Sequence, residues 1–238
     1  MKFLVLSRDS SGSLIVSKND LHHLKVLRFG DEIELPGLFG SEKYSVKLRR
    51  IKRDYEVLSI NPDGMVEHGK TILYLPLIET SRLEWCLEKA TELGINEFQF
   101  YYSDRTADLP ADLRRVNSKM DRFQQKVLAA CQQSGNLDIP ILREPRSLRE
   151  IMEEFPAENS GHIFGLGMGA CECVDLKNMD ITYGAFLVGP EGDFSEREYE
   201  EFRKYPFLVL KKLRPDLVLR SETAAVYLAS LNHFSSRH

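Results

Sequence analysis

The sequence predicts an α/β protein in two parts, a small β-rich unit followed by a larger unit built on a mostly parallel sheet. Residues 1–68 contain short apolar runs at close spacing, separated by turn residues, and this spacing is typical of a small barrel. From Thr71 onward, strand-length apolar runs alternate with amphipathic stretches, which favours parallel strands connected by helices. The sequence therefore predicts a first domain over residues 1–68 and a second domain over residues 69–238.

Composition and charge restrict the class of protein. A hydrophobic fraction of 42% suits a globular chain, and no apolar run approaches the roughly 18–20 residues of a membrane span. The apolar run at the N-terminus is too short for a signal peptide, so we expect a cytoplasmic protein without membrane contact. A single Cys-x-Cys pair is weak evidence for a metal, so we expect no metal site and reduced thiols at Cys86, Cys131, Cys171 and Cys173.

In the first domain, the apolar runs predict strands at residues 3–6, 14–16, 33–35, 44–48 and 55–60. Turn residues at Pro36-Gly37 and at residues 61–64 are expected to separate strands. Residues 20–28 predict a short helix whose leucines face the core, at Leu21, Leu24 and Leu27. This helix leaves three polar side chains on its outer face, namely His23, Lys25 and Arg28.

The densest basic stretch of the chain lies at residues 43–53. Alternation along a strand would place several of its cations on one face, namely Lys43, Lys47, Arg49 and Arg53. The net charge of −4 gives the whole molecule no basic character, so a contact with nucleic acid would need a local patch such as this one. The same pattern is also consistent with a solvated edge strand that its charges protect from pairing with another chain.

In the second domain, strands are predicted at residues 72–77, 98–102, 162–164, 185–188 and 207–210. A capping box of Ser81 and Glu84 predicts the start of the first helix, and Gly94 its end. A helical period over residues 116–134 predicts one long helix. Further helices are expected to begin at Ser195, which has a capping partner three residues on, and near Glu222.

Two loops are expected to form a ligand site at one edge of the parallel sheet. The first is Gly189-Pro190-Glu191-Gly192, where two glycines let a ligand approach main-chain N–H groups. The second is the long connection over residues 211–221. Both follow strand ends, and open α/β sheets bind ligands at that edge. A tight strand-to-helix turn without a ligand remains the alternative for the first loop.

The run from Gly165 to Ala170 fits the dinucleotide-binding pattern G-x-G-x-x-[G/A] and would by itself suggest a nicotinamide-dependent oxidoreductase. It does not lie in the first strand–helix turn of its domain, and the residues after it lack a helical period. We therefore expect this loop to line the same pocket as Gly189.

Several blocks of the sequence now carry a resemblance. They are HHLKVLR at residues 22–28, LEWCLEKATELGINEF at 83–98, SDRT at 103–106, GPEG at 189–192 and VLRSETAA at 218–225. Together they resemble the RsmE family of SPOUT-class methyltransferases, which use S-adenosylmethionine to methylate N3 of a uridine in 16S ribosomal RNA. The resemblance spans nearly the whole chain. It implies a PUA-like RNA-binding β-barrel over residues 1–68, a SPOUT domain with a deep trefoil knot over residues 69–238, a homodimer, and the 30S subunit as partner.

The resemblance also implies roles for individual residues. The cofactor pocket would comprise Gly165, Leu166, Gly167, Val188, Gly189, Pro190, Glu191, Gly192, Leu213, Leu217, Leu219 and Thr223. The RNA contacts would come from His23, Lys25, Arg28, Lys47, Arg49 and Arg105. Arg220 would stabilise the developing uridine anion, and Glu222 would accept a proton or orient Arg220. Glu191 is the second candidate for the base.

Each of these roles has a plainer alternative. Glu222 could be a first-turn carboxylate that the helix dipole favours, and Arg105 could pair with Asp104 or Asp108. His22 and His23 could cap and pack their short helix.

The sequence departs from the family pattern at several positions. Asp193 follows Gly-Pro-Glu-Gly where the family has glycine, and residues 213–217 lack a usual glycine in the segment expected to wrap the adenine. Gln132 and Asn136 replace a glutamate and an arginine. A non-catalytic RNA-binding relative is therefore the alternative to an enzyme.

Overall fold

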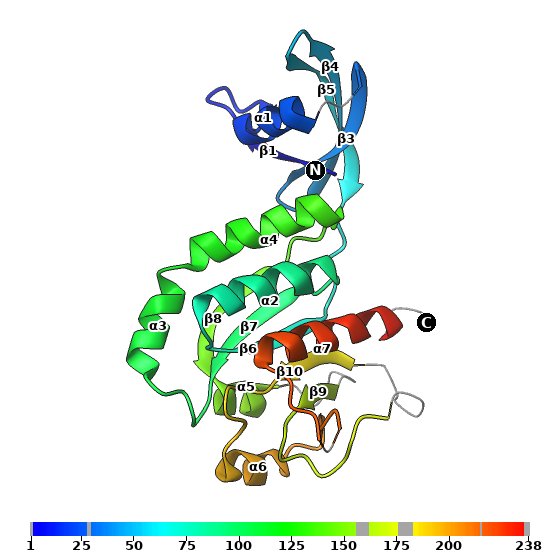
Figure 1. The fold of residues 1–238 in the computed structure, drawn as a ribbon. Helices are drawn as coiled ribbons and strands as arrows, with labels where there is room; N and C mark the ends of the chain where they lie inside the picture. Colours follow the sequence, from blue (N-terminus) through cyan, green and yellow to red (C-terminus); the bar gives the residue numbers. More distant parts are fainter. Residues whose placement is uncertain (1, 28–29, 156–161, 176–182, 215, 236–238) are drawn as a thin grey trace. The chain divides into compact units, whose positions relative to one another are not determined.

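The computed structural model describes residues 2–27, 30–155, 162–175, 183–214 and 216–235 (Figure 1). Its contacts divide the chain into two compact units, and the main division falls between His68 and Gly69. Residues 128–139 group with the first unit, although the sequence pattern did not separate them from the second.

The first unit is a nearly closed, barrel-like sheet in the order β2-β1-β3-β4-β5. Strand β1 pairs in parallel with β3, and the other neighbours are antiparallel. One helix, α1 (Lys18–Leu27), packs against β5, and its Leu24 is fully buried in the core. The strands are β1 (Leu4–Arg8), β2 (Leu14–Val16), β3 (Glu32–Phe39), β4 (Glu42–Ile51) and β5 (Asp54–Met65).

The two turns expected inside this sheet are wrong. Pro36-Gly37 lies within β3, where Gly37 pairs with Leu4 and with Tyr44. A Cβ at Gly37 would come within 2.7 Å of the Val46 side chain, so this glycine serves close packing rather than a turn. Residues 61–64 lie within β5, an edge strand, where a proline can be accommodated.

A buried carboxylate holds the first unit together. The Asp20 side chain is only 2% exposed and accepts hydrogen bonds from the Val5 main-chain N–H at 2.6 Å and from Gln132 Nε2 at 3.1 Å. Gln132 Nε2 also donates to the Phe3 carbonyl oxygen at 3.3 Å. The substitution of Gln132 for the family's glutamate therefore supplies a donor to a buried acceptor.

The second unit is an all-parallel, six-stranded sheet in the order β11-β9-β10-β6-β7-β8. Its central strand β6 is buried on both faces, with Leu73 and Leu75 on one side and Tyr74 on the other. The strands are β6 (Ile72–Pro76), β7 (Glu97–Tyr102), β8 (Ile141–Ser147), β9 (His162–Leu166), β10 (Tyr183–Val188) and β11 (Leu208–Lys211).

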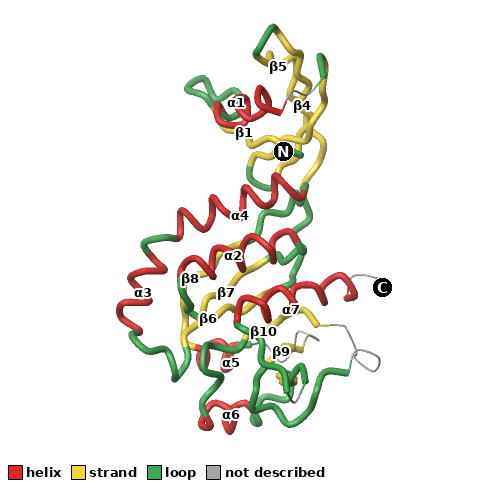
Figure 2. Tube along the Cα trace, in the orientation of Figure 1, coloured by secondary structure: helices red, strands yellow, loops and turns green. Residues whose placement is uncertain are grey.

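Helices cover this sheet. Helix α7 packs against β10, β6 and α2, and Figure 2 shows α2 and α7 running across the strands. Residues of α5 and α6 belong to a separate core cluster with Tyr74 and Tyr101. The helices are α2 (Thr80–Glu92), α3 (Leu109–Asn117), α4 (Met120–Ser134), α5 (Leu148–Glu154), α6 (Glu196–Phe202) and α7 (Ser221–Ser235).

The structure corrects two helix predictions and confirms a third. Helix α2 begins one residue before Ser81, and its N-cap, Glu79, makes no side-chain capping bond. The predicted single helix over residues 116–134 is two helices, because Ser118 caps the end of α3 through Arg114 and Val116 carbonyls. The capping box of Ser195 and Glu198 is confirmed at the start of α6.

The chain segment that follows β11 crosses back over the parallel sheet. From β11, which pairs with β9, the chain returns across the sheet to α7 over β10 and β6. The resemblance predicts that the last part of the chain threads a loop to form a trefoil knot. Residues 176–182, which connect β9 to β10, lie outside the described residues. Within the described part of the chain, no helix is both long and apolar enough to cross a membrane.

Replacement of Asp20 by alanine should lower the free energy of unfolding by about 3 kcal/mol, since hydrogen bonds to a charged acceptor are lost inside the fold. Urea unfolding of the variant measures this change. The exposed Asp31 is the matched control, and Asp31→Ala should change stability by no more than about 0.5 kcal/mol. Equal stability of the two variants would contradict the role assigned to Asp20.

Candidate functional site

A cavity of about 460 Å³ lies in the second unit at the carboxyl ends of β9, β10 and β11. The loop after β9, the loop after β10 and the segment from β11 to α7 form its walls. This is the edge at which parallel sheets bind ligands, and the sequence analysis predicted that these loops would meet there.

Most residues predicted for the cofactor pocket line this cavity, namely Leu166, Gly167, Gly189, Pro190, Glu191, Gly192, Leu213, Leu217 and Leu219. Gly165 and Val188 lie within β9 and β10, just before the lining residues. Thr223 lies exposed on α7 and is not among the lining residues.

Two glycines of the cavity lining allow close packing of the loops around it. A Cβ at Gly189 would lie 2.9 Å from the Leu166 carbonyl oxygen, and a Cβ at Gly167 would collide with the Tyr199 hydroxyl. A side chain at either position would therefore displace its neighbours. Glycine at these positions permits the close approach of the loops, and both residues line the cavity.

The dinucleotide-binding pattern at residues 165–170 does not lie in a strand-to-helix turn of the described chain. Gly165 lies inside β9, and residues 167–175 of the described chain contain no helix. Without a helix N-terminus after the glycines, the segment lacks the element that binds a pyrophosphate in dinucleotide folds. The glycine run instead lines the cavity, as we expected.

Asp193, which stands where the family pattern has glycine, connects the two glycine-containing loops. Its backbone has φ of 66°, a left-handed conformation that aspartate tolerates better than most residues. Its carboxylate accepts hydrogen bonds from Met168 N at 3.1 Å and Gly169 N at 2.9 Å. The Tyr199 hydroxyl of α6 donates to the same carboxylate, at 2.9 and 3.0 Å from its two oxygens. Burial, and then the charge of Asp193, raise the pKa of Tyr199, which keeps this hydroxyl protonated as a donor.

Two arginines hold the Gly-Pro-Glu-Gly loop from its other side. Arg82 of α2 forms an ion pair with Glu191, and Arg105 after β7 donates to the Gly192 carbonyl oxygen. Ser221, at the start of α7, donates from Oγ to the Gly189 carbonyl oxygen at 2.9 Å. The loop is therefore tied to three elements that precede or follow it in the sequence by many residues.

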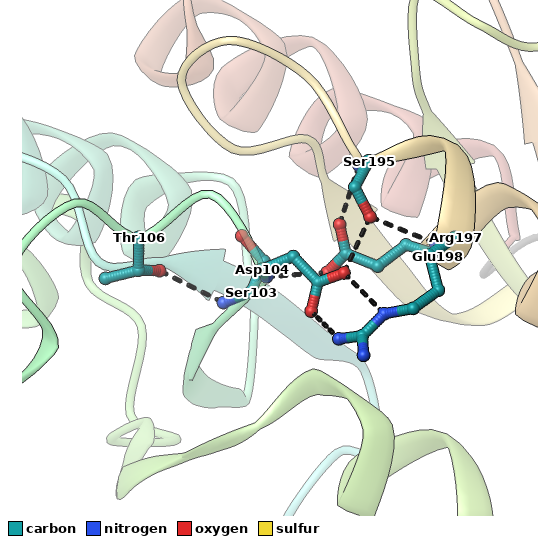
Figure 3. Close-up of polar contacts among 6 residues, drawn as sticks. All are labelled: Ser103, Asp104, Thr106, Ser195, Arg197 and Glu198. Carbon is teal, nitrogen blue, oxygen red and sulfur yellow. Dashed lines mark hydrogen bonds and ion pairs between the residues drawn. The ribbon is translucent and has the colours of Figure 1, made fainter.

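A polar network fixes the helix that follows this loop (Figure 3). Asp104, after β7, accepts from Arg197 Nε at 3.0 Å and from Ser195 Oγ at 2.7 Å, while its own N–H donates to Glu198 Oε1 at 3.0 Å. The Arg197 guanidinium holds the pKa of Asp104 below its usual range, although burial opposes the shift. Asp104 therefore pairs with α6, and Arg105 pairs with neither Asp104 nor Asp108 among the hydrogen bonds and ion pairs of the described residues.

The two catalytic candidates lie in different surroundings. Arg220 is exposed and lines the cavity. Glu222 does not line it, and its Oε2 atom is buried without a hydrogen-bond partner among the described residues. Burial, and then the negative charge of Glu222, raise the pKa of the Cys86 thiol in α2 to about 12. The structure thus brings Arg220 and Glu191, but not Glu222, to the cavity lining.

The cavity is rich in cations, with Arg82, Lys212, Arg214 and Arg220 in its lining. Arg214 pairs with Asp216 at 3.0 Å, and the Leu217 N–H donates to the Arg214 carbonyl oxygen at 3.4 Å. A tight turn thus accommodates the segment that departs from the family pattern. Large apolar side chains are exposed at the cavity, namely Met168, Leu217 and Val218.

In the first unit, carboxylates face the basic strand. Arg49 pairs with Glu32 at 2.9 Å and Lys47 with Glu34 at 3.6 Å, each directly opposite on β3. Lys43 pairs with a carboxylate of β5 at 2.7 Å, so three cations of this face are partly neutralised by cross-strand pairs.

The remaining RNA candidates of this unit are dispersed. His23 is exposed on α1, and Lys25 pairs with Asp54 at 2.6 Å. Arg53 lies beyond the end of β4, so it does not continue the strand face as predicted. Arg28 lies outside the described residues.

Comparisons with known proteins agree on one class. The family model of an RNA methyltransferase domain matches residues 67–233. Ribosomal RNA small subunit methyltransferase E of Mesomycoplasma hyopneumoniae is 28% identical over 220 residues, covering 90% of this chain and 91% of that protein. The protein of the same name from Helicobacter pylori strain J99 is 25% identical over 215 residues, covering 89% of this chain and 88% of the relative.

A solved structure matches the whole fold. A ribosomal RNA small subunit methyltransferase E from Neisseria gonorrhoeae, crystallised with S-adenosyl methionine bound, has a TM-score of 0.72 at 25% identity and covers 98% of this chain and 97% of its own. Fold and site therefore define an RNA methyltransferase of the SPOUT type. More particularly, the chain belongs to the RsmE family, whose members are the ribosomal RNA small subunit methyltransferases E.

Replacement of Asp193 by alanine should speed amide hydrogen exchange at Met168 and Gly169 by about tenfold or more, because a hydrogen bond to a charged acceptor contributes about 1.5–3 kcal/mol. Hydrogen-exchange mass spectrometry of this loop measures the effect. Asp216→Ala, which removes an exposed carboxylate outside the cavity lining, should leave both amides unchanged. Unchanged exchange in the Asp193 variant would show that the carboxylate does not hold the loop.

Proposed function

We propose that this protein transfers a methyl group from S-adenosylmethionine to N3 of a uridine in 16S ribosomal RNA of the small ribosomal subunit. The observation that carries the proposal is the glycine-lined cavity at the carboxyl ends of β9, β10 and β11, in a chain of the RsmE family. The S-adenosyl methionine bound to the related structure from Neisseria gonorrhoeae supports the choice of cofactor.

The residues present fit this cofactor. Leu213, Leu217 and Leu219 offer an apolar wall for the adenosine, and Gly189, which lines the same cavity, offers main-chain groups to the ribose. Lys212 and the neighbouring arginines provide the positive charge that an amino-acid carboxylate requires. When bound, S-adenosylmethionine supplies an electrophilic methyl group on a sulfonium.

The protein's own residues must position the acceptor and manage its charge. Methyl transfer is an in-line displacement, so rate depends chiefly on orientation. Uridine N3 carries a proton that must leave, and negative charge develops on the adjacent carbonyl oxygens. Arg220 is exposed at the cavity, and its guanidinium can stabilise that charge. We assign Glu222 no contact with the substrate, since it does not line the cavity and one of its carboxylate oxygens is buried.

We further propose that the protein acts on the 30S subunit, that it forms a homodimer and that it is cytoplasmic. The names of the relatives, small subunit methyltransferases, support the first. The exposed apolar side chains of Met168, Leu217 and Val218 beside the cavity support the second, because a partner chain that covered them would also enclose the donor. RNA contacts by the exposed His23 of α1 and by Arg105 after β7 remain part of the proposal.

The test is methyl transfer to 30S subunits that lack the modification, followed by mass spectrometry of the nucleosides. The expected product is N3-methyluridine in 16S ribosomal RNA. Transfer to another atom or base would contradict the N3 assignment. Binding of 30S subunits without any transfer would instead support a non-catalytic RNA-binding protein.

Arg220→Ala should lower kcat by about 100-fold or more, as expected for removal of a donor to a developing negative charge. The KM for 30S subunits should change little, because the interaction strengthens only as charge develops. Arg203→Ala removes an exposed arginine at the end of α6, outside this cavity's lining, and serves as the matched control. Wild-type kcat in the Arg220 variant would remove Arg220 from the mechanism.

A further inference from the structure

A second cavity, of about 430 Å³, lies beside the donor cavity in the same unit. It is formed at the carboxyl ends of β6 and β7, between the start of α2 and α3. Pro190 and Glu191 line both cavities, so the two cavities adjoin at the loop after β10. A ligand in the second cavity would therefore face the donor across Glu191.

The chemistry of the second cavity suits a neutral ring with both donors and acceptors. Two arginines line it, Arg105 and Arg115, together with three carboxylates, namely Glu79, Asp112 and Glu191. With more carboxylates than cations in its lining, the cavity disfavours a phosphate group. A nucleobase, which has carbonyl oxygens and ring N–H groups but no charge, matches such a lining.

Two of the lining side chains are held in place before any ligand binds. Arg115 donates to Asp112 Oδ1 at 2.7 Å and to Thr80 Oγ1 at 3.1 Å. Glu191 forms its ion pair with Arg82, which lines the donor cavity. Asp112 thus orients Arg115, and Arg82 orients Glu191. Both side chains therefore lose little conformational freedom when they bind a ligand.

We propose that this second cavity receives the acceptor uracil after it leaves the RNA stack, with Glu191 as the base. The inference rests on the proposed function. Enzymes that act on a base must take it out of the helix, and they recognise it by hydrogen bonds to its polar edge. Here Arg105 and Arg115 donate to one uracil carbonyl oxygen, and the N3 edge faces the loop that borders both cavities, so that the other carbonyl oxygen is left for Arg220 of the donor cavity.

The reaction balances with the groups present and the proposed cofactor. The N3 proton passes to the Glu191 carboxylate, and the N3 electron pair forms the new bond to the methyl carbon. The carbon–sulfur bond breaks, and its electron pair remains on sulfur, so the sulfonium becomes a neutral thioether. The Arg82 guanidinium stays paired with Glu191 and orients it throughout.

Ala107 allows the cavity to be filled without disturbing the core. This residue is exposed and lines the second cavity but not the donor cavity. Ala107→Phe should lower kcat/KM for 30S subunits by about 100-fold, since misplaced reactants lose that order of rate. Calorimetric binding of S-adenosylhomocysteine should stay within about threefold of wild type. The matched control, Ala129→Phe on the exposed side of α4, should change neither quantity.

Glu191→Gln tests the base separately, because glutamine keeps the shape of the side chain. Its kcat should fall by about 100-fold, with little change in KM, as expected for loss of a general base. Near-wild-type kcat/KM in Ala107→Phe, or near-wild-type kcat in Glu191→Gln, would overturn the inference while the proposed function stood. Absence of transfer by the wild-type protein would overturn the proposed function, and the inference with it.

Discussion

The carboxylate of Asp193 joins three elements at the ligand edge of the parallel sheet. It accepts the main-chain N–H groups of Met168 and Gly169 in the loop after β9, and the Tyr199 hydroxyl of α6. Because Asp193 itself ends the loop after β10, a single side chain fixes the spacing of the loops that form the donor cavity. Without it, the glycines on either side would leave these loops free to separate.

Further contacts hold the loop after β10 in place before any ligand binds. The ion pair of Arg82 with Glu191 and the bond from Ser221 to Gly189 hold the other side of the same loop. Asp104 links helix α6, which follows the loop after β10, to the end of β7. A loop held from both sides can keep donor and acceptor in line, which is the main requirement of methyl transfer. The same loop also borders both cavities.

Periodicity and motifs predicted five strands of the parallel sheet but not β8 (Ile141–Ser147), and they also predicted the start of α6 and the loops that meet at the cavity. They did not reveal Arg82 or Ser221 as site residues, since each bonds a residue distant in sequence. Glu222 is a similar case: it lies two residues from Arg220 in the sequence, but it does not line the cavity, and one of its carboxylate oxygens is buried. Gly37 and Pro62 looked like turn residues because single-sequence patterns do not record packing across strands.

The affinity for S-adenosylhomocysteine of Asp193→Ala and Asp193→Asn, measured by calorimetry beside the wild type, tests the central claim most directly. Wild-type protein should bind close to one ligand per chain. The alanine variant should bind about tenfold more weakly or worse, and the asparagine variant should lie between, since an amide oxygen can accept some of the same hydrogen bonds. Equal affinity in all three proteins would contradict the claim that this carboxylate builds the donor site.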